Sequence, residues 1–474
     1  MSKKELIGFL LGLLFLFATI LFPTPFSNLN QDSWLTLGVM LLMATWWLTE
    51  CVPVAATALL PIIVVPLLKI GNLREITESY GHPLIFLFLG GFILSIALER
   101  SNLHRRIART VLLITGTQLK WQVAAIMMTT AFLSMWMSNT ATSIMMLPIA
   151  LSILHLLDED NSNPELASTM LLAVAYSASI GGIATLIGTP PNALMAAYLL
   201  ETYQIEIGFA KWMAFGLPFS ISLLVLTWLW LTRNLKNDEQ INASKVRAIF
   251  RKELKDMGKL STQEFRVAII AICAALGWMF RTLIVEKTGI VISDTSIAIF
   301  AALLFFIIPS GKGNGDRLLI WESTKKIPWG VLLLFGGGLA LAKIINSSGL
   351  ADEIGQLVST LGAGNTTLII ALVIVCIVTL TEVTSNTATS ASFIPILGPV
   401  AVLMSLNPQT LVFAAAISAS CAFMMPVATP PNAIVYGSGR LELRDMIKAG
   451  SVLNIISCLL IFLFIKFYLP YVFN

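Results

Sequence analysis

The sequence predicts an all-α protein that crosses a membrane many times. Of its 474 residues, 57% are hydrophobic and only 12% are charged, whereas soluble domains carry about 25% charged residues. Apolar stretches of about 20 residues, the length of a membrane-spanning helix, recur along the chain, and none alternates like a membrane β-strand. We expect about eleven spanning helices, in segments 6–22, 34–49, 52–68, 83–98, 168–200, 212–231, 267–285, 292–309, 329–345, 411–437 and 450–470.

The first apolar segment follows Lys3 and Lys4 and therefore resembles a signal peptide. The segment is long, however, and 22–25 (Phe-Pro-Thr-Pro) is a poor match to the small-residue site at which signal peptides are cleaved. We therefore expect this segment to remain as the first spanning helix.

Two further apolar stretches, 121–156 and 366–404, hold polar residues at their centres. If each forms a re-entrant hairpin that returns to its own side, 23 of the 30 Lys and Arg residues fall on one side of the membrane. Cytoplasmic loops carry the excess of positive charge, so we expect a cytoplasmic N-terminus and an outer C-terminus. Counting each hairpin as a single span would instead send the nine positive charges of 233–266 across the membrane.

The chain contains an internal repeat whose best-preserved stretches are polar. Three motifs occur twice in the same order, at offsets of 246, 247 and 240 residues. They are Phe88-Leu89-Gly90-Gly91 with Leu334-Phe335-Gly336-Gly337, Met137-Ser138-Asn139-Thr140-Ala141-Thr142-Ser143 with Thr384-Ser385-Asn386-Thr387-Ala388-Thr389-Ser390, and Gly188-Thr189-Pro190-Pro191-Asn192-Ala193 with Ala428-Thr429-Pro430-Pro431-Asn432-Ala433. On the expected topology the two hairpins enter from opposite sides. Inverted repeats with interrupted helices are the architecture of secondary transporters.

The repeated motifs combine features that suit a cation and an anion. Paired prolines break a helix and leave carbonyl groups without donors, and unwound carbonyls at membrane depth coordinate Na⁺. Ser, Asn and Thr are good residues for capping helix N-termini, which attract anions. Two such sets facing each other suit a substrate with two carboxylates.

Glu382 departs from the repeat, because Met135 occupies its counterpart position in the first half. An ionisable residue at membrane depth is by default a candidate for function. We therefore keep two interpretations open for Glu382, a structural hydrogen bond and a part in ion coupling.

With these paired motifs the chain resembles the divalent anion/sodium symporters, which carry dicarboxylates, citrate or sulfate, over nearly its whole length. The resemblance implies a homodimer in which a transport domain moves like an elevator against a scaffold. It implies scaffold helices in 1–120 and 267–365, transport halves in 121–232 and 366–474, and a cytoplasmic linker in 233–266.

The same resemblance implies co-transported sodium ions, with at least two sites. The first site would use Ser134, Ser138, Asn139 and the carbonyl group of Gly188, and the second would use Thr381, Ser385, Asn386 and the carbonyl group of Ala428. The substrate carboxylates would contact Ser138, Asn139, Thr140, Thr189, Ser385, Asn386, Thr387, Thr429 and Pro430.

We therefore expect sodium-coupled uptake of C4-dicarboxylates, such as succinate, malate or fumarate, across the cell membrane. A dicarboxylate exchanger, or a carrier of citrate or sulfate, stays an alternative, because the family contains exchangers with similar motifs. An enzyme would need acid–base or nucleophilic groups in the cavity, and the hairpins offer none except Glu382. A channel would need no inverted pair of broken helices.

Other ligand classes find little support in the sequence. The five cysteines are scattered through apolar segments without metal-ligand spacing, so we expect buried free thiols. The three histidines form no cluster, and a net charge of +4 gives no indication of a nucleic-acid partner.

Overall fold

The regular structure of the chain is almost entirely helical. The computed structural model describes residues 2–25, 29–114, 118–157, 163–235, 251–313, 315–354 and 365–473, so residues 236–250 of the expected linker lie outside it. Within the described residues, eight helical stretches are long and apolar enough to span a membrane, and five shorter apolar helices accompany them. The prediction of an all-α polytopic membrane protein is confirmed.

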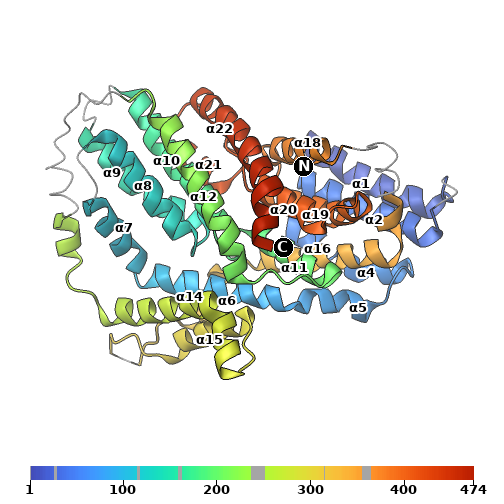
Figure 1. Ribbon diagram of the computed structural model, residues 1–474, viewed down its shortest axis with the longest axis horizontal. Helices are drawn as coiled ribbons and strands as arrows, with labels where there is room; N and C mark the ends of the chain where they lie inside the picture. The colour runs from blue at the N-terminus through green and yellow to red at the C-terminus, as the bar shows by residue number, and fades with distance from the viewer. Residues whose placement is uncertain are drawn as a thin grey trace.

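The first half of the chain opens with α1 to α7 and continues into a helical hairpin and a broken helix (Figure 1). The expected span 52–68 is split between Thr57 and Leu60, because Pro61 has no N–H to donate to the carbonyl oxygen of Thr57. The helices are α1 (Lys3–Leu21), α2 (Gln31–Thr49), α3 (Val54–Thr57), α4 (Leu60–Leu67), α5 (Leu73–Glu78), α6 (Pro83–Arg100), α7 (Leu103–Ile114), α8 (Leu119–Ser134), α9 (Asn139–Leu157), α10 (Pro164–Ile183), α11 (Pro190–Tyr203) and α12 (Phe209–Thr232).

The second half follows the same order in its central part. A hairpin of α18 (Thr366–Thr381) and α19 (Asn386–Leu403) corresponds to α8 and α9, and the broken pair α20 (Pro408–Ala419) and α21 (Pro430–Tyr436) corresponds to α10 and α11. The remaining helices are α14 (Thr262–Thr288), α15 (Asp294–Ile307), α16 (Trp329–Ser347), α22 (Leu443–Leu463) and α23 (Leu469–Phe473).

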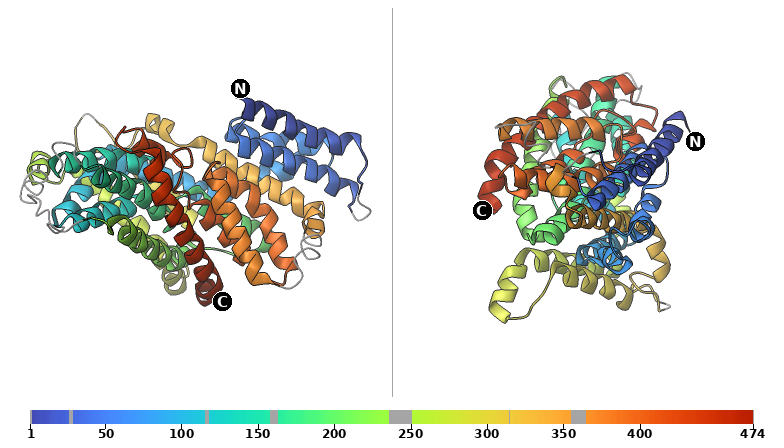
Figure 2. Two further views of the ribbon diagram at one scale, coloured as in Figure 1. Left: turned by 90° about the horizontal axis from the view of Figure 1, so that it is seen from above. Right: turned by 90° about the vertical axis from the view of Figure 1, so that its right-hand side faces the viewer.

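The helices pack so that each hairpin lies against the broken helix of its own half. Helix α10 contacts both α8 and α9, and α20 contacts both α18 and α19. Helix α16 contacts α2, α11 and α19, and it therefore lies between elements of the two halves. The pair α1 and α2 lies at one end of the molecule, far from α8 and α9 at the other (Figure 2).

The beginning of α14 marks the side on which the chain starts. Arg106 of α7 forms an ion pair with Glu264 at 2.8 Å, and Arg109 forms one with Glu253 at 2.7 Å. Arg109 also lines the same cavity mouth as Lys4. Helix α7 therefore contacts the described part of the linker and lines the same cavity as the N-terminal end of α1.

The other end of α14 marks the side on which the chain ends. Arg281 lies 3.3 Å from Asp294, whose carboxylate accepts a hydrogen bond from the backbone N–H of Phe209 at 2.8 Å. The first turn of α12 is thereby fixed at this end, where Lys211 lies 5.0 Å from the ring centroid of Phe473. The two ends of the chain therefore lie toward opposite ends of α14.

The expectation of buried thiols is wrong for most of the cysteines. All five are free, but only Cys421 is buried, while Cys273 and Cys376 are exposed and Cys51 and Cys458 are half-buried. The exposed pair lies on faces of α14 and α18 that also expose Ile272, Leu276, Leu372 and Val375. Apolar side chains on such faces suit contact with lipid, so an apolar sequence neighbourhood did not distinguish core from lipid-facing surface.

Gly181 allows the close packing of α8 on α10 that positions the first hairpin. A Cβ atom at this residue would meet the backbone of Ala131, with the Cα atom of Ala131 at 2.5 Å. We expect Gly181→Ala to destabilise the protein by about 1–3 kcal/mol, because a helix backbone cannot yield to the added methyl group. Thermal unfolding in detergent would measure this. Gly81→Ala is the matched control, since a Cβ there meets nothing within 4 Å; equal unfolding temperatures for the two variants would contradict the packing argument.

Candidate functional site

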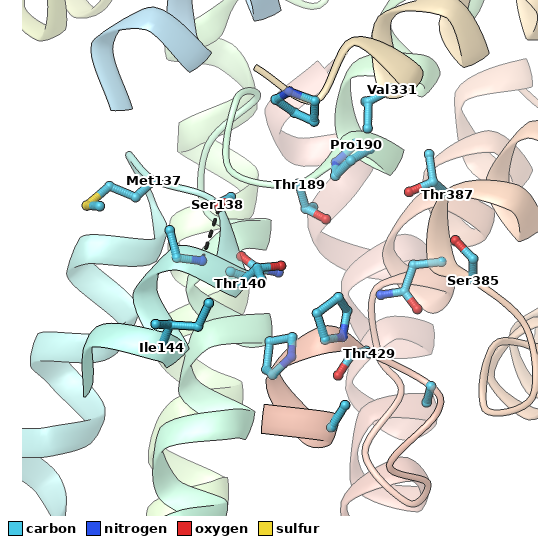
Figure 3. A pocket seen from close by; sticks show the side chains of 18 of the residues that line it. Met137, Ser138, Thr140, Ile144, Thr189, Pro190, Val331, Ser385, Thr387 and Thr429 are labelled. Atoms are coloured by element: carbon cyan, nitrogen blue, oxygen red, sulfur yellow. Dashed lines mark hydrogen bonds between the residues drawn. The ribbon is translucent and has the colours of Figure 1, made fainter. Parts of the chain in front are cut away.

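The repeated polar motifs of the two halves line one large cavity. The cavity has a volume of about 1420 Å³. Ser138 and Thr140 of the first hairpin face Ser385 and Thr387 of the second across it (Figure 3). Of the predicted site residues, eleven line the cavity: Ser138, Asn139, Thr140, Gly188, Thr189, Ser385, Asn386, Thr387, Ala428, Thr429 and Pro430. The structure therefore brings together residues that lie about half the chain apart.

The two remaining predicted residues, Ser134 and Thr381, lie behind the cavity wall, and both are fully buried. Ser134 Oγ is 2.6 Å from Asn139 Oδ1 and 2.7 Å from the carbonyl oxygen of Ala178. A hydroxyl group has one hydrogen and donates it to one acceptor at a time. When Ala178 accepts it, the oxygens of Ser134 and Asn139 face each other with lone pairs, an arrangement that a cation would stabilise.

The second half repeats this arrangement. Thr381 Oγ1 is 2.8 Å from Asn386 Oδ1 and 2.9 Å from the carbonyl oxygen of Ala419. A Ser or Thr hydroxyl, an Asn amide oxygen and a helix carbonyl therefore converge in both halves. The carbonyl oxygens of Ala178 and Ala419 were not expected from the sequence, because a backbone acceptor leaves no mark on residue type.

The space beside the first cluster depends on a glycine. A Cβ atom at Gly182 would lie 2.6 Å from Asn139 Oδ1 and 3.1 Å from the carbonyl oxygen of Gly188. Both oxygens thus border one small volume that a side chain would fill. Neutral oxygen ligands around such a volume fit Na⁺, so the residues present suit the ion that the sequence implied.

The prediction that Ser-Asn-Thr caps a helix holds for one half only. Helix α9 begins at Asn139, and Ser138 Oγ accepts a hydrogen bond from the N–H of Ala141 at 3.2 Å. Ser385 precedes α19 in the same way, but its side chain accepts no capping bond. In this structure Ser385 Oγ is therefore left available to the cavity, whereas Ser138 Oγ is engaged.

Asn192 and Asn432 stabilise the non-helical segments between α10 and α11 and between α20 and α21. Asn192 Nδ2 donates to the carbonyl oxygen of Thr185 at 2.8 Å, and Asn432 Nδ2 donates to that of Met425 at 3.0 Å. Both residues are fully buried. The sequence showed them as the final Asn of the repeated Thr-Pro-Pro-Asn, and that repetition was the available signal for a shared role.

Glu382 is buried and accepts hydrogen bonds from unwound backbone. Its carboxylate takes the N–H groups of Phe423, Met424 and Met425 at 2.7–3.0 Å. It also accepts from Nδ2 of Asn454 on α22 at 2.7 Å. Glu382 does not line the cavity, so the structural-hydrogen-bond interpretation fits its position.

The cavity is uncharged at its base and charged at its mouth. Among the described residues that line it, those contributed by the two hairpins and the two breaks carry no charge. The charged lining residues are Lys4, Glu5, Glu50, Glu99, Arg105, Arg109 and Lys326. The cavity therefore opens toward the N-terminal end of α1, and any charge at its base must be met by dipoles, hydroxyls, amides and bound ions.

Solved structures share this fold at low sequence identity. The YdaH transporter of Alcanivorax borkumensis superposes with a TM-score of 0.61 at 14% identity, covering 99% of both chains. MtrF of Neisseria gonorrhoeae superposes with a TM-score of 0.58 at 13% identity, covering 98% of this chain and 96% of that one. Their likeness shows that the chain shares their helical fold.

Comparison with known sequences identifies the family of the chain. The chain is 40% identical over 481 residues to the sodium-dependent dicarboxylate transporter SdcS of Staphylococcus aureus strains USA300 and NCTC 8325, covering 99% of this chain and 92% of the relative. Residues 3–474 match the family model described as the sodium:sulfate symporter transmembrane region. The chain therefore belongs to the sodium:sulfate symporter family, the divalent anion/sodium symporters that its paired motifs resemble.

Proposed function

We propose that the protein is a secondary transporter that couples sodium entry to uptake of C4-dicarboxylates. The observation that carries this proposal is the pair of matching oxygen clusters beside an uncharged cavity base. The 40% identity to a sodium-dependent dicarboxylate transporter over nearly the whole chain supports it. Sodium ions bound at the two clusters, through the residues set out above, would neutralise a substrate that the protein meets without Lys or Arg.

The substrate would lie between the two hairpin tips. Its carboxylates would accept hydrogen bonds from Ser385, Thr140 and Thr387, with Thr189, Thr429 and Pro430 closing the cavity between them. Asn139 and Asn386 can present the amide oxygen to a cation and the NH₂ group to a carboxylate. Each of these side chains would thus contact both the sodium ion and the substrate.

The movement we propose is an elevator, in which α8–α12 and α18–α23 slide against a scaffold of the remaining helices in a homodimer. The cavity mouth is lined by Arg105 and Arg109 of the positively charged segment 99–120. Positive charge favours the cytoplasmic side, which supports an N-terminus inside, a C-terminus outside and a conformation open to the cytoplasm.

Sodium should drive concentrative uptake of succinate by the purified protein in liposomes. An inward sodium gradient is expected to accumulate labelled succinate, and an equal potassium gradient is not. The physical reason is that a buried dianion needs compensating charge. Uptake that is indifferent to sodium but requires dicarboxylate inside the liposomes would identify an exchanger instead.

Asn139→Ala and Asn386→Ala should each lower succinate uptake by about 100-fold, because each removes a contact to a charged group on both cargoes. Uptake in liposomes measures this, with the unfolding temperature showing that each variant is folded. Asn346→Ala is the matched control, since Asn346 is exposed at the end of α16. Normal uptake by a folded Asn139 or Asn386 variant would place the site elsewhere.

Ser134→Ala and Thr381→Ala should weaken sodium binding first and succinate binding as a consequence. Coupling is reciprocal, so sodium and succinate raise each other's affinity by the same factor. Calorimetric titration of succinate at low and high sodium would show weak binding that high sodium partly restores. Thr379→Ala is the control, because its hydroxyl lies on the exposed face of the same helix and bonds only to the carbonyl of Val375. Succinate affinity that is independent of sodium in the parent protein would defeat charge compensation.

A further inference from the structure

The two halves of the repeat unwind differently at their breaks. Asn192 donates to the carbonyl oxygens of Gly182 and Thr185, and Asn432 donates to those of Ala422 and Met425. Gly182 is therefore equivalent to Ala422, and Thr185 is equivalent to Met425. Helix α10 runs to Ile183 and includes Gly182, whereas α20 ends at Ala419, before Ala422. The second half therefore leaves about one turn of backbone outside a helix that the first half keeps inside one.

Unwound backbone at membrane depth needs acceptors from within the protein. In the second half Glu382 supplies them, because three consecutive N–H groups, from Phe423 to Met425, converge on its carboxylate. In the first half Met135 stands at the corresponding place and offers only its backbone carbonyl, which accepts from Thr185 Oγ1 at 2.6 Å. A carboxylate is thus present at this position only in the second half, where α20 ends about one turn earlier than α10.

The fixed segment leads directly to the second cation cluster. The N–H of Met425 binds Glu382, and its carbonyl oxygen accepts from Asn432 Nδ2 at 3.0 Å and from the N–H of Ala428 at 3.2 Å. The N–H and the carbonyl group of Met425 are therefore both fixed by hydrogen bonds, and the bond to the carbonyl oxygen also fixes Ala428. At the other end, Glu382 follows Thr381, whose hydroxyl belongs to the same cluster.

We propose that Glu382 is a positioning residue for the second sodium site, through which it sets the affinity of that site for Na⁺. The inference rests on the proposed function and deepens it. Glu382 holds the Phe423–Met425 segment, and Met425 in turn holds Ala428, which lines the cavity together with Asn386. The first half needs no such residue, because α10 itself holds Gly182 and Ile183, which correspond to Ala422 and Phe423.

The test measures sodium binding without substrate. A ligand that binds only the folded state stabilises it by RT ln(1 + [L]/Kd), so the unfolding temperature of the parent, titrated with NaCl at constant ionic strength against KCl, yields a Kd for sodium. Glu382→Gln is expected to raise this sodium Kd about tenfold or more, because the amide NH₂ cannot accept the N–H groups that the carboxylate accepts. Asn454→Ala, which removes one of the contacts to Glu382, should give a smaller rise and serves if Glu382→Gln does not fold.

Double variants separate positioning from general loosening. In a Thr381→Ala background the second site is already lost, so adding Glu382→Gln should leave the sodium requirement unchanged. In a Ser134→Ala background the added change should produce its full effect. Equal effects in both backgrounds, or an unchanged sodium requirement in Glu382→Gln itself, would overturn the inference.

The same titration distinguishes this inference from the proposed function. If the parent is not stabilised by sodium over potassium, sodium coupling fails and the inference fails with it. If the parent is stabilised and Glu382→Gln keeps the parent's sodium requirement, only the role of Glu382 is wrong. Thr379→Ala, on the exposed face of α18, should behave like the parent throughout.

Discussion

Backbone that leaves the helix inside a membrane must find its hydrogen-bond partners within the protein, since no water is there to supply them. Most of the site follows from this constraint. Paired prolines begin α11 and α21 after the two breaks, and buried Asn192 and Asn432 bond the carbonyl oxygens of Thr185 and Met425 inside the breaks. What is left over is a small set of carbonyl and hydroxyl oxygens with no fixed donor, and these are the groups that a cation can use.

Cations bound by these oxygens would also explain how an uncharged cavity base can bind a doubly charged substrate. A C4-dicarboxylate carries two negative charges near neutral pH, because carboxyl pKa values are about 4. A fixed Arg or Lys at the cavity base would bind that substrate in every conformation, and it would remain as a buried charge after release. On the proposed function, cations that arrive and leave with the substrate would avoid this, because they would cancel its charge only while it is bound.

Much of the fold could be predicted from the sequence because membrane helices and broken helices have strong local signals. Apolar length predicted helices in the right regions, although the expected spans 52–68, 168–200 and 411–437 are each split in two. The doubled Ser-Asn-Thr and Thr-Pro-Pro predicted that residues 247 positions apart lie in one cavity. The predictions that were wrong share a cause, because each concerned a property that depends on tertiary packing. Apolar segments did not show that Cys273 and Cys376 would be exposed. Identical Ser-Asn-Thr triplets did not show that Ser138 would cap its helix and Ser385 would not.

Glu382 marks the place where the internal repeat is not exact. Helix α10 keeps its last turn and has Met135 at the position that corresponds to Glu382, while α20 ends about one turn earlier. In the second half the Glu382 carboxylate accepts from three consecutive N–H groups, and it thereby replaces the acceptors that the missing helical turn would have provided. The backbone before the two breaks is therefore held in different ways, by a helical turn in the first half and by a side chain in the second. On the proposed function, the same kinds of cation ligand would be presented by two differently supported stretches of backbone.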